Sequence, residues 1–254
     1  NGRSVSLTEA GELLYIEGRK IMDLYEGLLQ SLDDIKGIRR GKLVLVASTI
    51  PGEYVLPGLI GAFNKVYPEI EVSLRIAGTG MAAQNILEGN ADLGAVGARL
   101  EDLDLVLEEF VQDELIVIAP TGQAYHKRQF TFADLAREHW VLREAGSGTR
   151  MVFYERLLES GINPGEIRVA MELGSTRAII TAVEAGLGLG IVSRLAAQDA
   201  LDLRKISEIR LNSGSILRSL YLTWNKNKYQ SFAARVFLSF VKNLTTPGNQ
   251  GAKE

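Results

Sequence analysis

The segment GKLVLVASTIPGEYVLPGLIGAFNKVYPEIEVSLRIA, residues 41–77, decides the fold of this chain. It opens with a run of apolar residues that predicts a buried strand and then turns at Pro51. The amphipathic stretch that follows begins as a helix near Pro57 and ends before Pro68. The last residues alternate between apolar and polar side chains, as a strand does. A strand, a helix and a second strand of these lengths predict a parallel βαβ unit.

The rest of the chain continues this alternation. A helix over 81–90 and a strand over 91–97 extend the first unit to βαβαβ, and residues 103–111 and 114–120 predict two further strands. The Pro-Thr-Gly sequence after them breaks the pattern, as a crossing between two lobes does. In the second set we expect helices over 132–138, 149–160, 176–186 and 229–244, and strands over 139–144, 167–173, 189–193 and 219–224. We therefore predict an α/β protein with two lobes and a cleft, and ligands of such sheets lie beyond the carboxyl ends of the strands.

A long helix precedes this α/β body. Ser6 and Glu9 fit a capping box at its start, and Thr8 is an alternative N-cap. The apolar residues that recur along it at intervals of seven are Leu14, Ile21, Leu28 and Ile35. This spacing predicts a seam for a partner helix, and the linker-like GIRRGK that follows favours a dimerisation helix. The alternative is an amphipathic helix that folds back on its own domain.

Composition excludes several classes of function. The 254 residues carry a formal net charge of -3, so the chain lacks the basic excess that sequence-independent binding of nucleic acid requires. The absence of cysteine removes disulfides, thiolate metal sites and cysteine nucleophiles, and the two histidines, His126 and His139, suggest neither catalysis nor a metal site. There is no apolar run of about 18 residues and no signal-peptide pattern. We expect a cytoplasmic protein without membrane contact.

Two glycine-rich segments raise the question of nucleotide binding. GTGMAA, residues 78–83, fits the dinucleotide fingerprint G-x-G-x-x-A, but it follows the second strand of its unit, and no acidic residue ends the next strand, where a ribose needs one. REAGSGTR, residues 143–150, has no lysine after its second glycine, so it is not a Walker loop. No paired carboxylates fall at strand ends either. We therefore expect no catalytic residues and no enzyme.

Hydroxyl-bearing residues recur where a strand ends and a helix begins. Helix N-termini present unpaired backbone N–H groups and a partial positive charge, which suit a small anion. The residues at these positions are Ser48, Thr49, Thr79, Gly80, Ser147, Gly148 and Thr149. We expect Arg150 to add charge, and Arg143, Arg177 and Arg194 to be solvated or salt-bridged. The alternative for each hydroxyl is a helix cap that binds no ligand.

Several segments together resemble a known family. They are, in chain order, GRSVSLTEAG before the long helix, F-x-x-x-YPEIEV, GNADLGAVG, REAGSGTR and VEAGLGLGIVS. The combination is similar to a LysR-type transcriptional regulator over essentially the whole chain. STIPGEYVLP and REAGSGTR further resemble the branch of that family associated with sulfur, selenium or related anion metabolism. The resemblance implies a dimerising linker helix and a two-lobed, periplasmic-binding-protein-like (type 2) domain that senses an effector.

The resemblance also implies how the chain is divided. Residues 1–7 are then a remnant of a winged helix-turn-helix wing, 8–40 the linker helix and hinge, 41–120 with 222–246 lobe I, 121–221 lobe II and 247–254 a disordered tail. Most of the DNA-binding domain is absent on this view. In the family the effector lies between the lobes, so the hydroxyl positions above map onto its cleft, with Thr176 and Ser193 as lesser candidates.

The hypothesis that follows is the effector-sensing part of a LysR-type regulator. It binds a small molecule, expected to be a small oxyanion, and uses no other cofactor. Its expected partners are DNA through the mostly absent domain, further copies of itself in a homodimer or homotetramer, and RNA polymerase in the full-length protein. The alternative is a solute-binding protein of a transporter with the same two lobes. The heptad helix and the wing-like GRSVSLTEAG argue against that alternative.

Overall fold

The computed structural model describes residues 7–35, 41–101, 104–122, 125 and 129–245. The expected wing remnant, apart from Leu7, lies outside these residues. The hinge that ends the segment 8–40 and the tail over 247–254 also lie outside them, as does His126.

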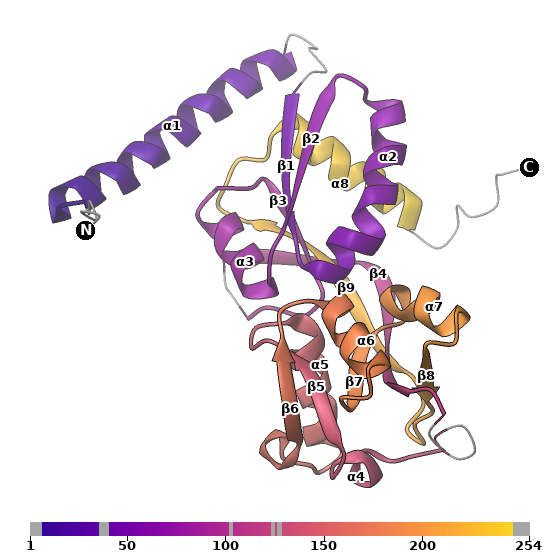
Figure 1. Cartoon of the computed structure of the whole chain (residues 1–254). Helices are drawn as coiled ribbons and strands as arrows, with labels where there is room; N and C mark the ends of the chain where they lie inside the picture. The colour runs from indigo at the N-terminus through magenta and orange to yellow at the C-terminus, as the bar shows by residue number, and fades with distance from the viewer. Residues whose placement is uncertain (1–6, 36–40, 102–103, 123–124, 126–128, 246–254) are drawn as a thin grey trace, which may run out of the picture.

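Helix α1 (Glu9–Ile35) projects away from the rest of the molecule (Figure 1). Thr8 caps it, because the Thr8 hydroxyl accepts a 3.2 Å hydrogen bond from the backbone N–H three residues later. Its heptad residues Leu14, Ile21 and Leu28 are exposed by 76%, 66% and 56%. An exposed apolar stripe does not fit a helix folded back along its own domain. It fits a helix that packs against a partner.

The first half of the body is a parallel sheet with helices on both faces. Its elements are β1 (Gly41–Ala47), the π-helical turn η1 (Pro51–Val55), α2 (Leu56–Val66), β2 (Ile70–Ile76), α3 (Thr79–Leu87), β3 (Leu93–Val96) and α8 (Phe232–Thr245). Strand β1 lies between β2 and β3 and is parallel to both, so the predicted βαβαβ unit is confirmed. Helices α2 and α8 pack together, and α3 packs against β1 and β3.

Two long antiparallel strands, β4 (Leu105–Pro120) and β9 (Ile216–Asn225), run from one half of the body to the other (Figure 1). They pair along the whole of β9, and the register shifts at Phe110, which forms a bulge. The sequence predicts two separate strands over 103–111 and 114–120, and this prediction is wrong. Pairing with β9 carries the strand through the polar residues that interrupt its apolar pattern.

The second half joins the other end of this crossing pair. Its elements are α4 (Phe132–Leu135), β5 (His139–Arg143), α5 (Gly148–Glu159), η3 (Pro164–Glu166), β6 (Arg168–Leu173), α6 (Thr176–Glu184), β7 (Leu189–Ser193), α7 (Arg194–Asp202) and β8 (Ile206–Ile209). Strands β7 and β8 pair with residues Leu115–Pro120 of β4, and β5 lies between β7 and β6. The sheet order is β2-β1-β3-β9-β4-β7-β5-β6, with β8 on β4.

Helix α7 and strand β8 are not predicted from the sequence. Helix α7 buries three alanines, Ala196, Ala197 and Ala200, rather than large apolar residues, so its apolar stripe is weak. Strand β8 has only four residues and is defined by its pairing with β4. Both elements therefore depend on tertiary contacts.

The GLGLG segment, residues 186–190, joins α6 to β7 by close packing. Gly186 has a positive φ of 84° and ends the helix, with its backbone N–H bonded to the carbonyl of Val183. A Cβ on Gly188 would lie 2.3 Å from the carbonyl oxygen of His139 on β5. A Cβ on Gly190 would lie 2.9 Å from Ile179 of α6. The glycines therefore let the helix and the sheet approach each other closely.

Aromatic side chains fill the centre of each half. In the first half Phe63 of α2 packs edge-on against Phe237 of α8, with ring centroids 5.1 Å apart. In the second half Trp140 of β5 packs on Phe153 of α5, with centroids 4.8 Å apart. All four rings are fully buried, and burial of each contributes about 1.5–3 kcal/mol. The cluster around Phe63 continues through the shared sheet to α6 and α7, and the cluster around Trp140 lies in the second half.

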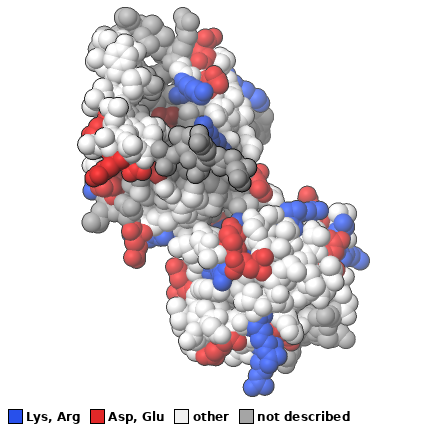
Figure 2. Space-filling model, turned by 60° about the vertical axis from the view of Figure 1, so that its left-hand side comes forward, with Lys and Arg blue, Asp and Glu red and all other residues white. Residues whose placement is uncertain are grey.

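Acidic and basic side chains are interspersed over the face that Figure 2 shows. The chain as a whole has 28 Lys and Arg against 31 Asp and Glu. Among the described residues on this face there is therefore no continuous basic surface for a nucleic-acid backbone. No helix in the described part of the chain is both long and apolar enough to cross a membrane.

Replacing Ile21 with Lys should weaken self-association of the chain. The substitution places a charge in the apolar seam of α1 and should raise the dimer dissociation constant at least about tenfold, or ~1.4 kcal/mol. The melting temperature of the α/β body should not change, because Ile21 lies on α1 and its side chain is largely exposed. Sedimentation velocity over a range of concentrations measures the association. The control is Glu12→Gln, which raises the net charge by one, as Ile21→Lys does, but outside the heptad series. Equal association of the two variants would contradict a pairing role for α1.

Candidate functional site

A small pocket opens where the carboxyl ends of β1 and β5 face each other across the two halves. The residues that line it are Ser48, Thr49, Gly78, Thr79, Gly97, Arg143, Ser147, Gly148, Thr149 and Arg218. They come from the end of β1, the start of α3, the segment after β3, the end of β5, the start of α5 and the strand β9. The strand ends and helix starts that the sequence singled out thus meet at one place.

Some hydroxyl groups of the pocket accept hydrogen bonds within the described chain, and others have no such bond. Ser48 Oγ accepts a 3.1 Å hydrogen bond from the backbone N–H of Gly97. Ser147 is the N-cap residue of α5, yet within the described residues its side chain makes no capping bond. By contrast Ser175, at the start of α6, accepts a hydrogen bond from the backbone N–H of Ala178. Capping therefore explains Ser175 but not Ser147.

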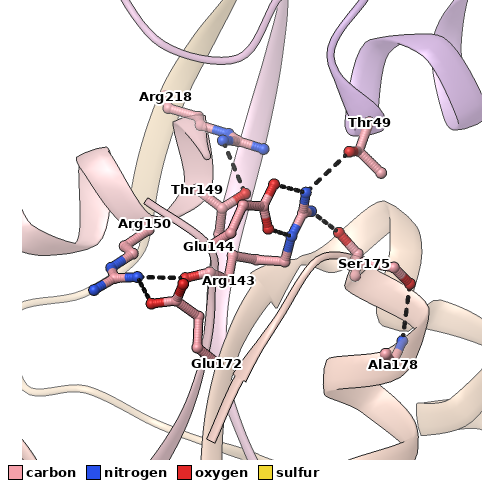
Figure 3. Close-up of polar contacts among 10 residues, drawn as sticks. Thr49, Arg143, Glu144, Thr149, Arg150, Glu172, Ser175, Ala178 and Arg218 are labelled. Atoms are coloured by element: carbon pink, nitrogen blue, oxygen red, sulfur yellow. Dashed lines mark hydrogen bonds and ion pairs between the residues drawn. The ribbon is translucent and has the colours of Figure 1, made fainter. Parts of the chain in front are cut away.

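Arg143 ends β5 and links the two halves (Figure 3). Its side chain is only 4% exposed. Nη1 donates to Thr176 Oγ1 at 2.7 Å, and Nη2 donates to Thr49 Oγ1 of the first half at 3.3 Å. Nε and Nη2 also donate to the two carboxylate oxygens of Glu144, at 2.7 and 2.8 Å. Burial raises the pKa of Glu144, but the hydrogen bonds and charge of Arg143 outweigh it and hold the pKa below the ordinary value.

Arg218 of β9 enters the pocket from the crossing strands. Its Nε donates to Asp113 Oδ2 on β4 at 2.8 Å, and Ser193 donates to the other oxygen of the same carboxylate at 2.6 Å. Its Nη1 donates to the carbonyl of Gly97 at 3.0 Å and to Thr149 Oγ1 at 3.3 Å. Burial lowers the pKa of Arg218, and the charge of Asp113 opposes this effect. The Asp113–Arg218 ion pair is thus buried and spans β4 and β9.

Two buried polar atoms of the pocket lack a hydrogen-bond partner within the described chain. One is Oγ1 of Thr79, a residue that is 1% exposed. The other is Nη2 of Arg218, which lies 2.7 Å from Asp113 Oδ2 but not in hydrogen-bond geometry. Arg218 Nη2 keeps its ionic contact with Asp113, so the unexplained atom is Thr79 Oγ1. A buried polar group without a partner costs about 1–3 kcal/mol and calls for an explanation such as a ligand.

Four of the ten predicted residues do not line the pocket. Gly80 is exposed on α3, one residue beyond Thr79. Arg150 turns away, because its guanidinium forms an ion pair with Glu172 and donates to the carbonyl of Arg143 (Figure 3). Thr176 and Ser193 are buried behind the pocket, where they bind Arg143 and Asp113. Thr176 thus holds the pocket residue Arg143, and Ser193 holds the carboxylate that binds Arg218.

Sequence reasoning missed both arginines of the pocket. Arg218 occupies an inward position of β9, since Ile216, Leu220 and Leu222 lie on the same face of the strand and are buried. A charged residue at a position where the alternation of the strand predicts an apolar one indicates a functional site, and this signal is present in the sequence. Arg143 was expected to be solvated or salt-bridged. It does pair with Glu144, but it also lines the pocket at the end of a buried strand.

The fold and the pocket define a two-lobed protein that binds small molecules, and comparison with known proteins gives its family. Residues 36–245 match the family model described as LysR substrate binding domain. The chain belongs to the LysR family of transcriptional regulators and contains an effector-binding domain of that family. The predicted periplasmic-binding-protein-like (type 2) fold is confirmed, and the regulator is favoured over the transporter protein.

Individual relatives agree with this assignment. The chain is 34% identical over 241 residues to a "Probable RuBisCO transcriptional regulator" of Cyanophora paradoxa, covering 93% of this chain and 74% of that protein. The Synechocystis PCC6803 CcmR regulatory domain in complex with 2-PG has a TM-score of 0.75 and 27% identity, over 82% of this chain and 99% of that one. Full-length CbnR in complex with its target DNA shares the fold, with a TM-score of 0.70 and 21% identity over 95% and 83% of the two chains.

These relatives settle the class of protein. LysR regulators bind DNA and form oligomers. The resemblance to a sulfur or selenium branch stays a prediction. Among the described residues there is no cluster of three or more His, Asp or Glu that would hold a metal ion.

Replacing Gly148 with Ala should weaken ligand binding by wedging the two walls of the pocket apart. A Cβ there would lie 3.0 Å from both the backbone of Gly97 and the hydroxyl of Thr79, across the pocket. We expect affinity for a pocket ligand to fall about tenfold, or ~1.4 kcal/mol. Gly80→Ala is the control, because a Cβ there meets nothing within 4 Å. Calorimetric titration of both variants measures the difference, and equal affinities would show that the contact across the pocket does not limit binding.

Proposed function

We propose that the pocket between the two halves is the effector site and that it binds a small anion. The observation that carries this proposal is the buried Oγ1 of Thr79, which has no hydrogen-bond partner within the described chain, on a pocket that also contains Arg143 and Arg218. Both arginines and the backbone N–H groups at the start of α5 are hydrogen-bond donors, which an anion satisfies. The site residues of the proposal are Ser48, Thr49, Thr79, Ser147, Gly148, Thr149, Arg143 and Arg218. Gly80 and Arg150 are left out of it.

The chemistry of the lining favours reversible binding over a reaction. Asp113 already binds Arg218 and Ser193, so it is not free to act as a base. The hydroxyls lie beside arginines rather than beside a histidine or an unpaired carboxylate that would activate them. The 27% identical CcmR domain, in complex with 2-PG, supports a small ligand in this fold. We propose that this chain likewise binds its ligand unchanged and is not an enzyme.

The same geometry suggests how binding reaches the DNA-binding part of a regulator. Ser48 and Thr49 follow the end of β1, and the start of β1 follows α1 in the chain. An anion that draws the two walls together changes the angle between the halves, and the dimer passes this change to α1. A ligand shifts such an equilibrium only by its preference for one arrangement. We propose a homodimer or homotetramer in the cytoplasm, with RNA polymerase as a further partner of the full-length regulator.

We also propose the division into two lobes that the family resemblance implies, with one change. Residues Leu115–Pro120 of β4 pair with β7 and β8 of the second half. The chain therefore crosses between the lobes within β4, near the bulge at Phe110, rather than after Pro120.

Small anions should raise the melting temperature of the protein. The panel is sulfate, sulfite, thiosulfate, selenite, phosphate, 2-PG and small carboxylates. A ligand at a hundred times its dissociation constant stabilises the folded state by about 2.7 kcal/mol, which corresponds to roughly 5–10 °C for a domain of this size.

Thr149→Val should lower affinity for the active anion about tenfold, since it deletes a buried hydroxyl of the pocket. Thr181→Val, on the exposed face of α6, is the control. Absence of any shift across the panel would contradict an anion site.

A further inference from the structure

We infer that the carboxylate of Glu144 occupies part of the anion-binding face of Arg143 and must be displaced when the ligand binds. Glu144 is then a built-in competitor that sets the affinity of the site. It selects ligands that present two anionic oxygens side by side, as a carboxylate or a larger oxyanion does. This inference rests on the proposed function of the pocket.

The first support is the geometry of the contact. The two oxygens of Glu144 lie 2.7 and 2.8 Å from Nε and Nη2 of Arg143, which is the paired, side-on arrangement that arginine forms with a carboxylate ligand (Figure 3). The remaining nitrogen, Nη1, donates to Thr176. The edge of the guanidinium that recognises anions is thus already in use by a group of the same chemistry.

The second support is the contrast between the two carboxylates beside the pocket. Asp113 is buried on β4 and receives hydrogen bonds from both Arg218 and Ser193, so its position is fixed. The Glu144 side chain is 33% exposed and belongs to the loop between β5 and α5. It can rotate into water, where its own charge is solvated, and an incoming anion then supplies the counter-charge of Arg143. Of the two carboxylates, Glu144 is the one that a ligand can replace.

The third support is the balance of charge. Arg143 is 4% exposed, and a buried guanidinium without a counter-charge is strongly unfavourable. In the arrangement described here two arginines face two carboxylates. An incoming anion would add excess negative charge unless one carboxylate left. Exchange of Glu144 for the ligand gives Arg143 a counter-charge both before and after binding. The apparent affinity is the intrinsic affinity multiplied by the fraction of time that Glu144 leaves the site open.

The matched control is the neighbouring pair of the same chemistry outside the pocket. Glu172 forms an ion pair with Arg150, which, unlike Arg143, does not line the pocket. Glu172→Gln removes one negative charge from the same lobe, as Glu144→Gln does. It therefore reports the general effect of net charge on the binding of an anion.

The experiment is calorimetric titration of the full chain with 2-PG and, separately, with sodium sulfate. Glu144→Gln should bind the probe about tenfold more tightly than the unmodified chain if Glu144 covers the site nine-tenths of the time. Glu172→Gln should stay within about twofold of the unmodified chain. Glu144→Ala, which removes the whole group, should also bind more tightly, and a thermal melt checks that both variants are folded.

The outcomes separate this inference from the proposed function. Tighter binding by both Glu144 variants, or binding by them alone, supports both. If the unmodified chain binds a probe but the Glu144 variants bind it equally or more weakly, Glu144 positions Arg143 instead of competing. The inference is then wrong, while the anion site stands. If Glu172→Gln raises the affinity for the probe as much as Glu144→Gln does, net charge explains the effect. The inference about Glu144 is then also wrong. If no protein binds either probe, the inference falls together with the use of this pocket for these anions.

Discussion

The buried ion pair between Asp113 and Arg218 is the constraint on which the rest of the structure depends. It joins β4 to β9, the two central strands of the sheet, with β3 beside β9 and with β7 and β8 beside β4. Removing one partner of a buried pair costs about 3–5 kcal/mol, so the pair fixes these strands side by side where the halves meet. Arg218 also donates to Gly97 of one half and Thr149 of the other. The ion pair thus adds a buried side-chain contact to the backbone pairing of the crossing strands, and it shapes the pocket.

The two arginines of the pocket have different tasks in this account. Arg218 is bound to Asp113, a carboxylate that has no exposure, and its Nη2 makes an ionic contact there without a hydrogen bond. Arg143 is bound to Glu144, a carboxylate that water already reaches. The carboxylate partner of Arg218 is therefore fixed, and the carboxylate partner of Arg143 can be exchanged for a ligand. A site of this kind binds an anion reversibly, as a sensor requires, because the ligand replaces an existing partner instead of filling a strongly charged void.

Much of the pocket could be predicted from the sequence, because parallel α/β topology brings strand ends and helix starts to one edge. This reasoning placed Ser48, Thr79 and Thr149 correctly at the pocket wall. It failed for arginines, whose long side chains reach partners that only tertiary structure defines. Arg150 follows Thr149 directly, but one residue of a helix turns the side chain by about 100°, and Arg150 meets Glu172 instead. For Arg218, the alternation of buried residues along β9 was a usable signal.

The most direct test of the account is the position of a bound anion. Crystals grown with selenate, whose selenium scatters anomalously, would show that position without reference to a presumed ligand. The account predicts an anomalous peak in the pocket, with anion oxygens within hydrogen-bond distance of Thr79 Oγ1, Arg218 Nη2 and the guanidinium of Arg143. An empty pocket in crystals that hold selenate at other sites of the protein would contradict it.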